Sequence, residues 1–370
     1  MHQLQLLLIF CLSLLHVACT PTTSEQTGKP VGIRHASLLH MEEADSFTLV
    51  RIGDAWHPGQ TLATYLLVPR DKPLPAQLPA GTVVRTPIKR AALTGSVHAA
   101  LFLDLGAENC IAAMADTAYV VSRRIRKLIG KNIQNMGSSL QPDLELLQAA
   151  RPDALFVSPF ENAGHGSLDR LKIPLIECAD YMETSPLGRA EWMRFYGRLV
   201  GQEARADSLF NAVEHSYLEL QRKMAKVQTP RPTVMCDLRT GATWYQPGGA
   251  STMGRFITDA GGRYLWADRT ESGSLPLDLE TVYARAAQAD IWLVKYGQIH
   301  NISYQQMAAD CAQYQQFKPW KSKRIWACNT FKTPFYEEVP FHPERLLIEL
   351  AAIFHPQSVS VKNPNYYHPL

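Results

Sequence analysis

The most regular apolar pattern of the chain lies near its middle. Between residues 203 and 227 apolar side chains recur every three or four positions, at Ala206, Leu209, Val213, Tyr217, Leu220, Met224 and Val227. This is the period of one helix face, and no Gly or Pro interrupts it before Pro230 and Pro232. The pattern predicts one continuous helix of roughly 37 Å.

Two segments on either side of this helix repeat one pattern. Residues 143–157 and 278–294 each begin with Asp-Leu-Glu, continue as a helix, and lead through an Asp into an apolar run. Residues 101–107 and 256–262 similarly share a helix that ends on a glycine. Because both matches occur in the same order, they predict two related α/β units, of which the first carries extra residues between Gly106 and Asp143.

The residues before the first unit favour β structure. The runs 46–52 and 61–68 flank a Pro-Gly turn and predict a hairpin, and residues 69–79 form a proline-rich connection. Short apolar runs then alternate with helical segments, which is typical of a parallel sheet. We therefore expect an α/β fold of two Rossmann-like lobes with mostly parallel sheets, joined by one long α-helix, plus an N-terminal β-hairpin extension.

These patterns also divide the chain. The expected divisions are an N-terminal β extension at 31–85, an N-lobe at 86–200, the linking helix at 201–229 and a C-lobe at 230–370. Lobes joined by one continuous helix cannot hinge as freely as lobes joined by flexible strands. We therefore expect small rocking of the lobes rather than wide closure.

The first residues are typical of an export signal. An apolar block from Leu6 to Leu15 is followed by Ala18, Cys19 and a polar tether. The block is shorter than a membrane span, and a Cys after a small residue is typical of a bacterial lipoprotein processing site. We expect residues 1–18 to be a signal peptide, residues 19–30 a linker, and Cys19 the lipidated first residue at an extracytoplasmic membrane face. The leader has no Lys or Arg, so a plain cleaved leader is the alternative.

Composition excludes several classes of protein. The chain has 370 residues and is 46% hydrophobic, which is enough for a folded core and argues against disorder. A net charge of +3 without a basic tail gives no reason to expect nucleic acid as a partner. No Gly-rich dinucleotide fingerprint, nucleophile elbow or phosphate loop is present. We therefore expect a binding protein rather than an enzyme, with a secreted two-lobe enzyme such as a glycosyltransferase as the more distant alternative.

Cysteine and histidine spacing gives no metal motif. The five cysteines that follow Cys19 lack zinc-site spacing, and the twelve histidines contain no close ligand pair, so we expect no resident metal. Cys110, Cys178 and Cys236 fall in apolar runs and are expected as small buried hydrophobes. Cys311 with Cys328 is the one pairing that we consider for a disulfide.

Candidate ligand-binding residues follow the expected strand ends. In open α/β sheets ligands lie beyond the carboxyl ends of the strands, so both lobes should turn these ends toward one cleft. The side chains there are mostly aromatic, with a few cations, and suit a bulky, partly anionic ligand. Trp244 and Tyr245 lie between turn signals, where an aromatic pair is harder to bury. The full set is Ser96, His98, Tyr119, Phe160 and Tyr181 in the N-lobe, and Arg239, Trp244, Tyr245, Gly249, Lys295, Tyr296, Phe331, Lys332 and Tyr336 in the C-lobe.

A known family shares this layout. The matching features, in order, are Leu93-Thr94-Gly95-Ser96, residues 137–153, the loop 247–251 with Ala260-Gly261-Gly262, and a closing helix at 343–356. With the leader, they resemble the substrate-binding proteins of ABC importers for ferric siderophores, haem and cobalamin. The resemblance covers roughly residues 86–356.

The resemblance implies a function and partners. The chain is expected to bind a ferric siderophore or haem between its lobes as a monomer, without a cofactor, and to deliver it to an ABC importer permease. A cobalamin or other corrinoid is the alternative ligand. Family members often place a glutamate on the first helix of each lobe to dock on the permease. Here both helix starts lack an acid, so either Glu161, Glu337 or Glu338 takes this role or docking relies less on charge.

Overall fold

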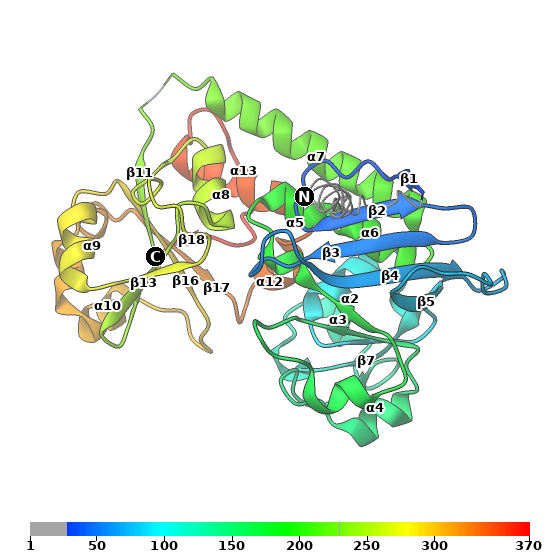
Figure 1. The fold of residues 1–370 in the computed structure, drawn as a ribbon. Helices are drawn as coiled ribbons and strands as arrows, with labels where there is room; N and C mark the ends of the chain where they lie inside the picture. The colour runs from blue at the N-terminus through cyan, green and yellow to red at the C-terminus, as the bar shows by residue number, and fades with distance from the viewer. Residues whose placement is uncertain (1–27, 229) are drawn as a thin grey trace, which may run out of the picture.

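The computed structural model describes residues 28–228 and 230–370, so the leader and Cys19 lie outside the described residues. Two α/β lobes lie beneath the long helix α7, with the C-lobe on the left and the N-lobe on the right in Figure 1. The expected α/β fold with two mostly parallel sheets and one long helix is confirmed. Among the described residues, none of the helices combines the length and apolar character needed to cross a bilayer.

The N-lobe is built on a five-stranded sheet. Its strands run parallel in the order β10-β9-β6-β7-β8. The bounds are β6 Ala91–Leu93, β7 Ile111–Met114, β8 Gln134–Asn135, β9 Ala154–Val157 and β10 Leu175–Glu177. Its helices are α2 Ser96–Asp104, α3 Arg123–Arg126, α4 Leu144–Ala150, α5 Pro186–Glu191 and α6 Met193–Leu199, with the 3₁₀ turns η1 Glu108–Cys110, η2 Thr117–Tyr119, η3 Gly166–Arg170 and η4 Ala179–Met182.

The C-lobe sheet has the order β14-β11-β16-β17-β18 and is parallel except for its last strand. The bounds are β11 Thr233–Cys236, β14 Arg263–Tyr264, β16 Ile291–Tyr296, β17 Ile325–Asn329 and β18 His368–Pro369. A small antiparallel sheet of β12 Arg239–Thr240, β13 Thr243–Pro247 and β15 Ser274–Leu277 adjoins it. Its helices are α8 Thr252–Asp259, α9 Leu279–Ala286, α10 Tyr304–Asp310, α11 Lys318–Lys321, α12 Phe335–Glu338 and α13 Pro343–Phe354, with η5 Ala312–Gln316.

The predicted repeat is confirmed. Asp143 and Asp278 cap α4 and α9, since each side chain accepts hydrogen bonds from the first turn of its helix. The helices lead into β9 and β16, which occupy matching places because β10-β9-β6-β7 corresponds to β17-β16-β11-β14. Gly106 and Gly261 follow α2 and α8 with φ of 71° and 82°, a left-handed conformation that favours glycine. The extra residues of the first copy include η2, α3 and β8.

The predicted linking helix is α7, Glu203–Ala225, of 23 residues. Its buried face includes Ala206, Val213, Tyr217 and Met224, as expected from the spacing. At its second turn Phe210 is buried, while Leu209 is only partly so. The helix packs on α6 of the N-lobe and on α13 of the C-lobe, so both lobes are fixed to one rod.

The predicted hairpin is β3 Thr48–Gly53 with β4 Thr61–Pro69, and it belongs to a larger sheet than expected. The strands β1 Lys29–Pro30, β2 Leu39–Glu43 and β5 Thr82–Thr86 complete the order β1-β2-β3-β4-β5. Two buried carboxylates of the N-lobe hold this sheet. Glu183 accepts hydrogen bonds from the backbone N–H groups of Ser37 and Leu38, and Glu191 accepts them from residues 34–36.

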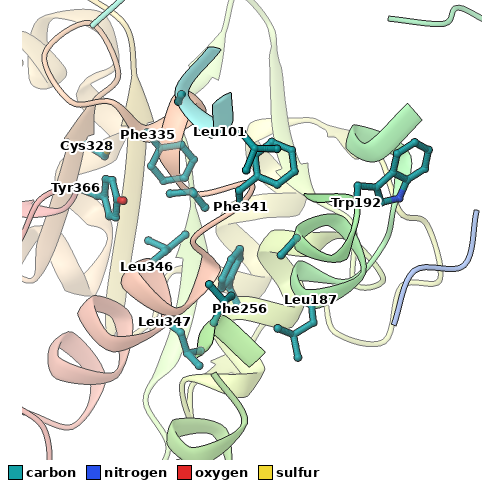
Figure 2. Close-up of a cluster of buried hydrophobic side chains, with 14 of the residues drawn as sticks. Leu101, Leu187, Trp192, Phe256, Cys328, Phe335, Phe341, Leu346, Leu347 and Tyr366 are labelled. Atoms are coloured by element: carbon teal, nitrogen blue, oxygen red, sulfur yellow. The ribbon is translucent and has the colours of Figure 1, made fainter. Parts of the chain in front are cut away.

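One continuous core joins the lobes. Figure 2 shows Leu101 and Leu187 of the N-lobe in the same buried cluster as Phe256, Phe335 and Leu346 of the C-lobe. Because these side chains exclude water between the lobes, their relative placement is held by apolar packing as well as by α7.

The described cysteines are free thiols, so the pairing of Cys311 with Cys328 is wrong. Cys178 and Cys236 are buried as expected, whereas Cys110 is only partly buried.

Candidate ligand site between the lobes

A pocket of about 130 Å³ lies between the two lobes. The N-lobe contributes α5, and the C-lobe contributes the starts of α8 and α12 together with the end of β16. The lining residues are Pro186, Arg189, Thr252, Met253, Phe256, Lys295, Phe335, Tyr336, Val339 and Pro340. The wall is therefore largely apolar and carries one cation from each lobe.

The N-lobe cation is Arg189, which is not among the site residues predicted from the sequence. Its Nε donates to Oδ2 of Asp180 at 3.1 Å, and Asp180 is only 1% exposed. Oδ1 of the same carboxylate accepts a hydrogen bond from Tyr196 at 2.7 Å and lies 3.1 Å from Nε2 of His98. Burial raises the pKa of Asp180, but His98, Arg189 and Tyr196 outweigh it and lower this pKa to about 2. The ionised carboxylate therefore fixes the orientation of Arg189.

The C-lobe cation is Lys295, a predicted site residue that does line the pocket. Its Nζ lies 5.2 Å and 5.5 Å from the ring centroids of Phe335 and Tyr336. Burial lowers the pKa of Lys295, but Asp237 and Tyr336 outweigh it, so the pKa is raised and the amine is charged. Oδ1 of Asp237 also accepts a hydrogen bond from the backbone N–H of Lys295 at 3.2 Å.

Most of the predicted aromatic side chains are exposed near strand ends. Tyr119 follows β7, Phe160 follows β9 and Tyr181 follows β10, while Phe331 and Tyr336 follow β17. All five are between 42% and 70% exposed. Phe160 also lines a hollow of about 400 Å³ at the ends of β6 and β9, together with Thr94, Ser158 and His165. Exposed rings on both lobes offer apolar contact area to a ligand.

The family model described as "Periplasmic binding protein" matches residues 91–328. The chain belongs to this family. Members of this family bind small molecules for ABC transporters and are not enzymes, as the sequence predicts for this chain.

Relatives and solved structures agree with this assignment. An uncharacterized lipoprotein of Methanocaldococcus jannaschii is 23% identical over 90% of this chain and 83% of its own length. A second one from that organism is 24% identical over 75% of this chain and 72% of its own. A structure titled as a periplasmic heme binding protein from Pseudomonas aeruginosa has a TM-score of 0.57 at 18% identity, and covers 75% of this chain and 96% of that one.

Two further solved structures share the fold. One, of an ABC-type Fe³⁺-hydroxamate transport system from Saccharomonospora viridis, has a TM-score of 0.56 at 17% identity, covering 72% of this chain and 93% of that one. A molybdate periplasmic binding protein of Haemophilus influenzae has a TM-score of 0.57 at 15% identity, covering 74% of this chain and 88% of that one. At these identities the likeness establishes the fold of this binding protein and leaves its ligand open.

Two predicted contacts of the binding protein are interior residues. Trp244 is 0% exposed; its Nε1 donates to the carbonyl of Cys236 at 3.0 Å, and its ring packs on Trp292. The prediction that it contacts ligand is wrong, because β13 alternates and turns Trp244 inward and Tyr245 outward. His98 is 4% exposed and acts behind the pocket, on Asp180, rather than in it.

The remaining predicted residues have smaller or structural roles. Ser96 begins α2 and is partly buried. The backbone N–H of Arg239 donates to Tyr314, and Tyr296 accepts a hydrogen bond from Ile302. A Cβ atom on Gly249 would lie 2.3 Å from the carbonyl oxygen of Arg269, so this glycine is required for close backbone packing. Lys332 is exposed beside Phe331.

Glu337, a predicted docking residue, is a contact between the lobes. It is 4% exposed, and its carboxylate accepts hydrogen bonds from the backbone N–H groups of Val121 at 2.9 Å and Ser122 at 2.7 Å. A carboxylate that is buried in this way is not available to arginines of a permease, so the prediction that Glu337 docks on the permease is wrong. Glu338 bonds to Arg345 and Tyr366, and Glu161 is exposed.

A second polar contact between the lobes involves His342, which precedes α13. Its Nε2 lies 3.1 Å from Oδ2 of Asp104 in α2, and its Nδ1 lies 3.2 Å from Glu344. Burial lowers the pKa of His342, but the hydrogen bonds to Asp104 and Glu344 outweigh it, so the pKa is raised. The pKa of Asp104 is lowered, because burial is outweighed by His342 and Arg124.

This contact predicts a pH dependence of stability. A basic group with a raised folded-state pKa stabilises the fold fully below its unfolded pKa of about 6.5, and loses this contribution as pH rises through the folded value. We expect the His342→Gln variant to be less stable than the wild type by on the order of 1 kcal/mol near pH 6, and the gap to narrow toward pH 9. Urea unfolding across this pH range measures the gap.

The matched control is His215→Gln. His215 is 75% exposed on α7, so its substitution should leave the unfolding curve unchanged at each pH. Parallel pH curves for the wild type and the His342→Gln variant would contradict the predicted role of the charge on His342, and coincident curves would show that the contact with Asp104 does not stabilise the fold.

Proposed function

We propose that this binding protein captures an iron chelate, either a ferric siderophore or haem, between its lobes and delivers it to the permease of an ABC importer. The observation that carries the proposal is the set of exposed aromatic side chains near the strand ends of both lobes, next to a pocket with one cation from each lobe. Rings supply apolar area for a large organic ligand, and cations attract its anionic groups. Two solved structures with this fold are titled for haem and for Fe³⁺-hydroxamate.

We also propose that the mature protein is held at an extracytoplasmic membrane face by acyl chains on Cys19. The support is the leader sequence, together with the names of two relatives, which are called lipoproteins. Each buried methylene contributes about 0.8 kcal/mol to membrane binding, so a multiply acylated cysteine suffices as an anchor.

The ligand is tested by native mass spectrometry of the mature protein. The probes are a ferric trishydroxamate, a ferric triscatecholate, haem and cobalamin, each titrated separately. We expect one of the three iron compounds to bind at one equivalent. Binding of cobalamin alone would replace the iron chelate with a corrinoid, and binding of none of the four would refute the proposal.

The double variant Phe160→Ala with Phe331→Ala tests the role of the rings. Each ring lies near a strand end of a different lobe, and both are about half exposed. We expect the affinity for the bound iron compound to fall by about tenfold, since each ring contributes roughly 0.5–1.5 kcal/mol. The control is Leu74→Ala, an exposed apolar side chain in the segment between β4 and β5. In Figure 1 this segment lies on the side of the N-lobe that faces away from the C-lobe. An equal affinity for the double variant and the control would remove these rings from the site.

A further inference from the structure

The pocket between the lobes combines an apolar wall with two cations. Met253, Phe256, Phe335 and Val339 line it beside Arg189 and Lys295. Figure 2 shows Phe256 and Phe335 within the buried cluster. A charge that faces such a wall is poorly screened by water, so its attraction for an opposite charge is stronger than on an open surface.

Arg189 is oriented for a second partner. Asp180 engages only its Nε, and over residues 28–228 and 230–370 no hydrogen bond involves the two terminal nitrogens. Because Tyr196 and His98 hold Asp180 in place, the guanidinium cannot turn away. The side chain is 25% exposed and lines the pocket, so its free terminal nitrogens can engage two oxygens of one anionic group.

Lys295 carries a charge without a close acidic partner. In the described part of the chain no carboxylate forms a salt bridge with its amine, although Asp237 acts on it from a greater distance. The amine lies instead over two aromatic rings. Such contacts compensate only part of the hydration that a buried ammonium loses. The side chain of Tyr336 forms a hydrogen bond with the amine, and an oxygen anion in the pocket would supply the negatively charged partner that the amine lacks.

We propose that this pocket is an anion subsite built by both lobes, in which Arg189 and Lys295 bind one carboxylate or similar oxyanion. A volume of about 130 Å³ suits such a group but not a whole macrocycle. In one case the anion is a side group of an iron chelate, and the rest of the chelate lies against the exposed rings. In that case the inference rests on the proposed function. A free tetrahedral oxyanion would offer the same negatively charged oxygen atoms to Arg189 and Lys295. Because Arg189 belongs to the N-lobe and Lys295 to the C-lobe, a bound anion also ties the lobes together.

The test compares ligands that differ in charge. Haem is paired with its dimethyl ester, in which both carboxylates are neutral, and a ferric triscatecholate is paired with a neutral ferric trishydroxamate. Molybdate and phosphate serve as free oxyanions. Calorimetric titration of the wild type should show at least about tenfold tighter binding of the anionic member of one pair, or binding of a free oxyanion.

Two variants and one control assign that preference to the pocket. Arg189→Gln and Lys295→Met should each reduce affinity for the anion by about tenfold or more and leave the neutral member unchanged. Arg189→Lys keeps the charge but loses the two-pronged geometry, so its affinity for the anion should lie between that of the wild type and that of Arg189→Gln. Lys321→Met, on α11 and outside the pocket, should bind as the wild type does. Unfolding midpoints of all variants identify any that fail to fold.

The outcomes separate this inference from the proposed function. If an iron chelate binds but neither variant changes the preference for charge, the anion subsite is refuted while the function stands. If only molybdate or phosphate binds and both variants abolish it, the subsite stands and the iron chelate is refuted. If the wild type shows no preference for any anion, the inference fails.

Discussion

Replacing Trp244 with alanine is expected to lower the free energy of unfolding by about 4 kcal/mol, which is typical for the loss of a fully buried aromatic side chain. Its ring packs between Trp292, Tyr314 and Phe317, with centroids 5.4 to 5.7 Å away. The substitution leaves a cavity among these rings and removes the indole donor to the Cys236 carbonyl. Denaturant unfolding followed by far-UV circular dichroism measures the change.

The adjacent residue provides the control. Tyr245 is 46% exposed on the opposite face of β13, so Tyr245→Ala should change the free energy of unfolding by less than about 0.5 kcal/mol. An unfolding midpoint of Trp244→Ala equal to that of the wild type would contradict its burial. Two neighbours in sequence thus separate a packing role from a surface role.

Features with an internal period or a local signal could be predicted from the sequence. The helix α7 repeats its apolar positions over six turns, and Asp143 and Asp278 cap their helices through bonds to residues two or three positions away. The hairpin of β3 and β4 is likewise local. In each case the interactions that determine the element lie within a short stretch of chain.

Features that depend on long-range contacts could not be predicted in this way. The pocket role of Arg189 follows from α5 lying beside α8 and α12, which no spacing in the sequence reveals. Glu337 is charged and its sequence context suggests the surface, but it is buried against Val121 and Ser122, more than 200 positions away. The error on Trp244 is different: residues 243–247 form a strand, and its alternation would have placed one aromatic inward.

The contacts between the lobes bear on how this binding protein changes shape. The expected rocking of the lobes stays a prediction, but the cluster in Figure 2 and the bonds of Glu337 add to the restraint that α7 imposes. Wide separation of the lobes would expose buried rings to water, which carries a cost in free energy, and would break the two hydrogen bonds that Glu337 accepts. A ligand that bridges Arg189 and Lys295 therefore needs only small adjustments of the lobes.

The attachment of the N-terminal sheet depends on buried carboxylates, and Glu191 is the one with no exposed surface. It accepts backbone hydrogen bonds from Arg34, His35 and Ala36 at 2.6 to 3.0 Å. Glu191→Gln replaces one acceptor oxygen with a donor, so buried N–H groups face an NH₂ group. We expect the free energy of unfolding to fall by about 3 kcal/mol, and the amides of residues 34–36 to lose protection from hydrogen exchange.

Hydrogen exchange distinguishes local from general damage. If the carboxylate holds the sheet, amides of residues 34–38 should exchange faster in Glu191→Gln, whereas those of β16 should stay protected under native conditions. Glu219→Gln on the exposed side of α7 is the matched control and should leave both regions unchanged, because the side chain of Glu219 is 72% exposed and its ion pair with His215 is as long as 3.6 Å. Unchanged protection of residues 34–38 in Glu191→Gln would mean that apolar packing beneath the sheet, rather than this carboxylate, attaches it to the N-lobe.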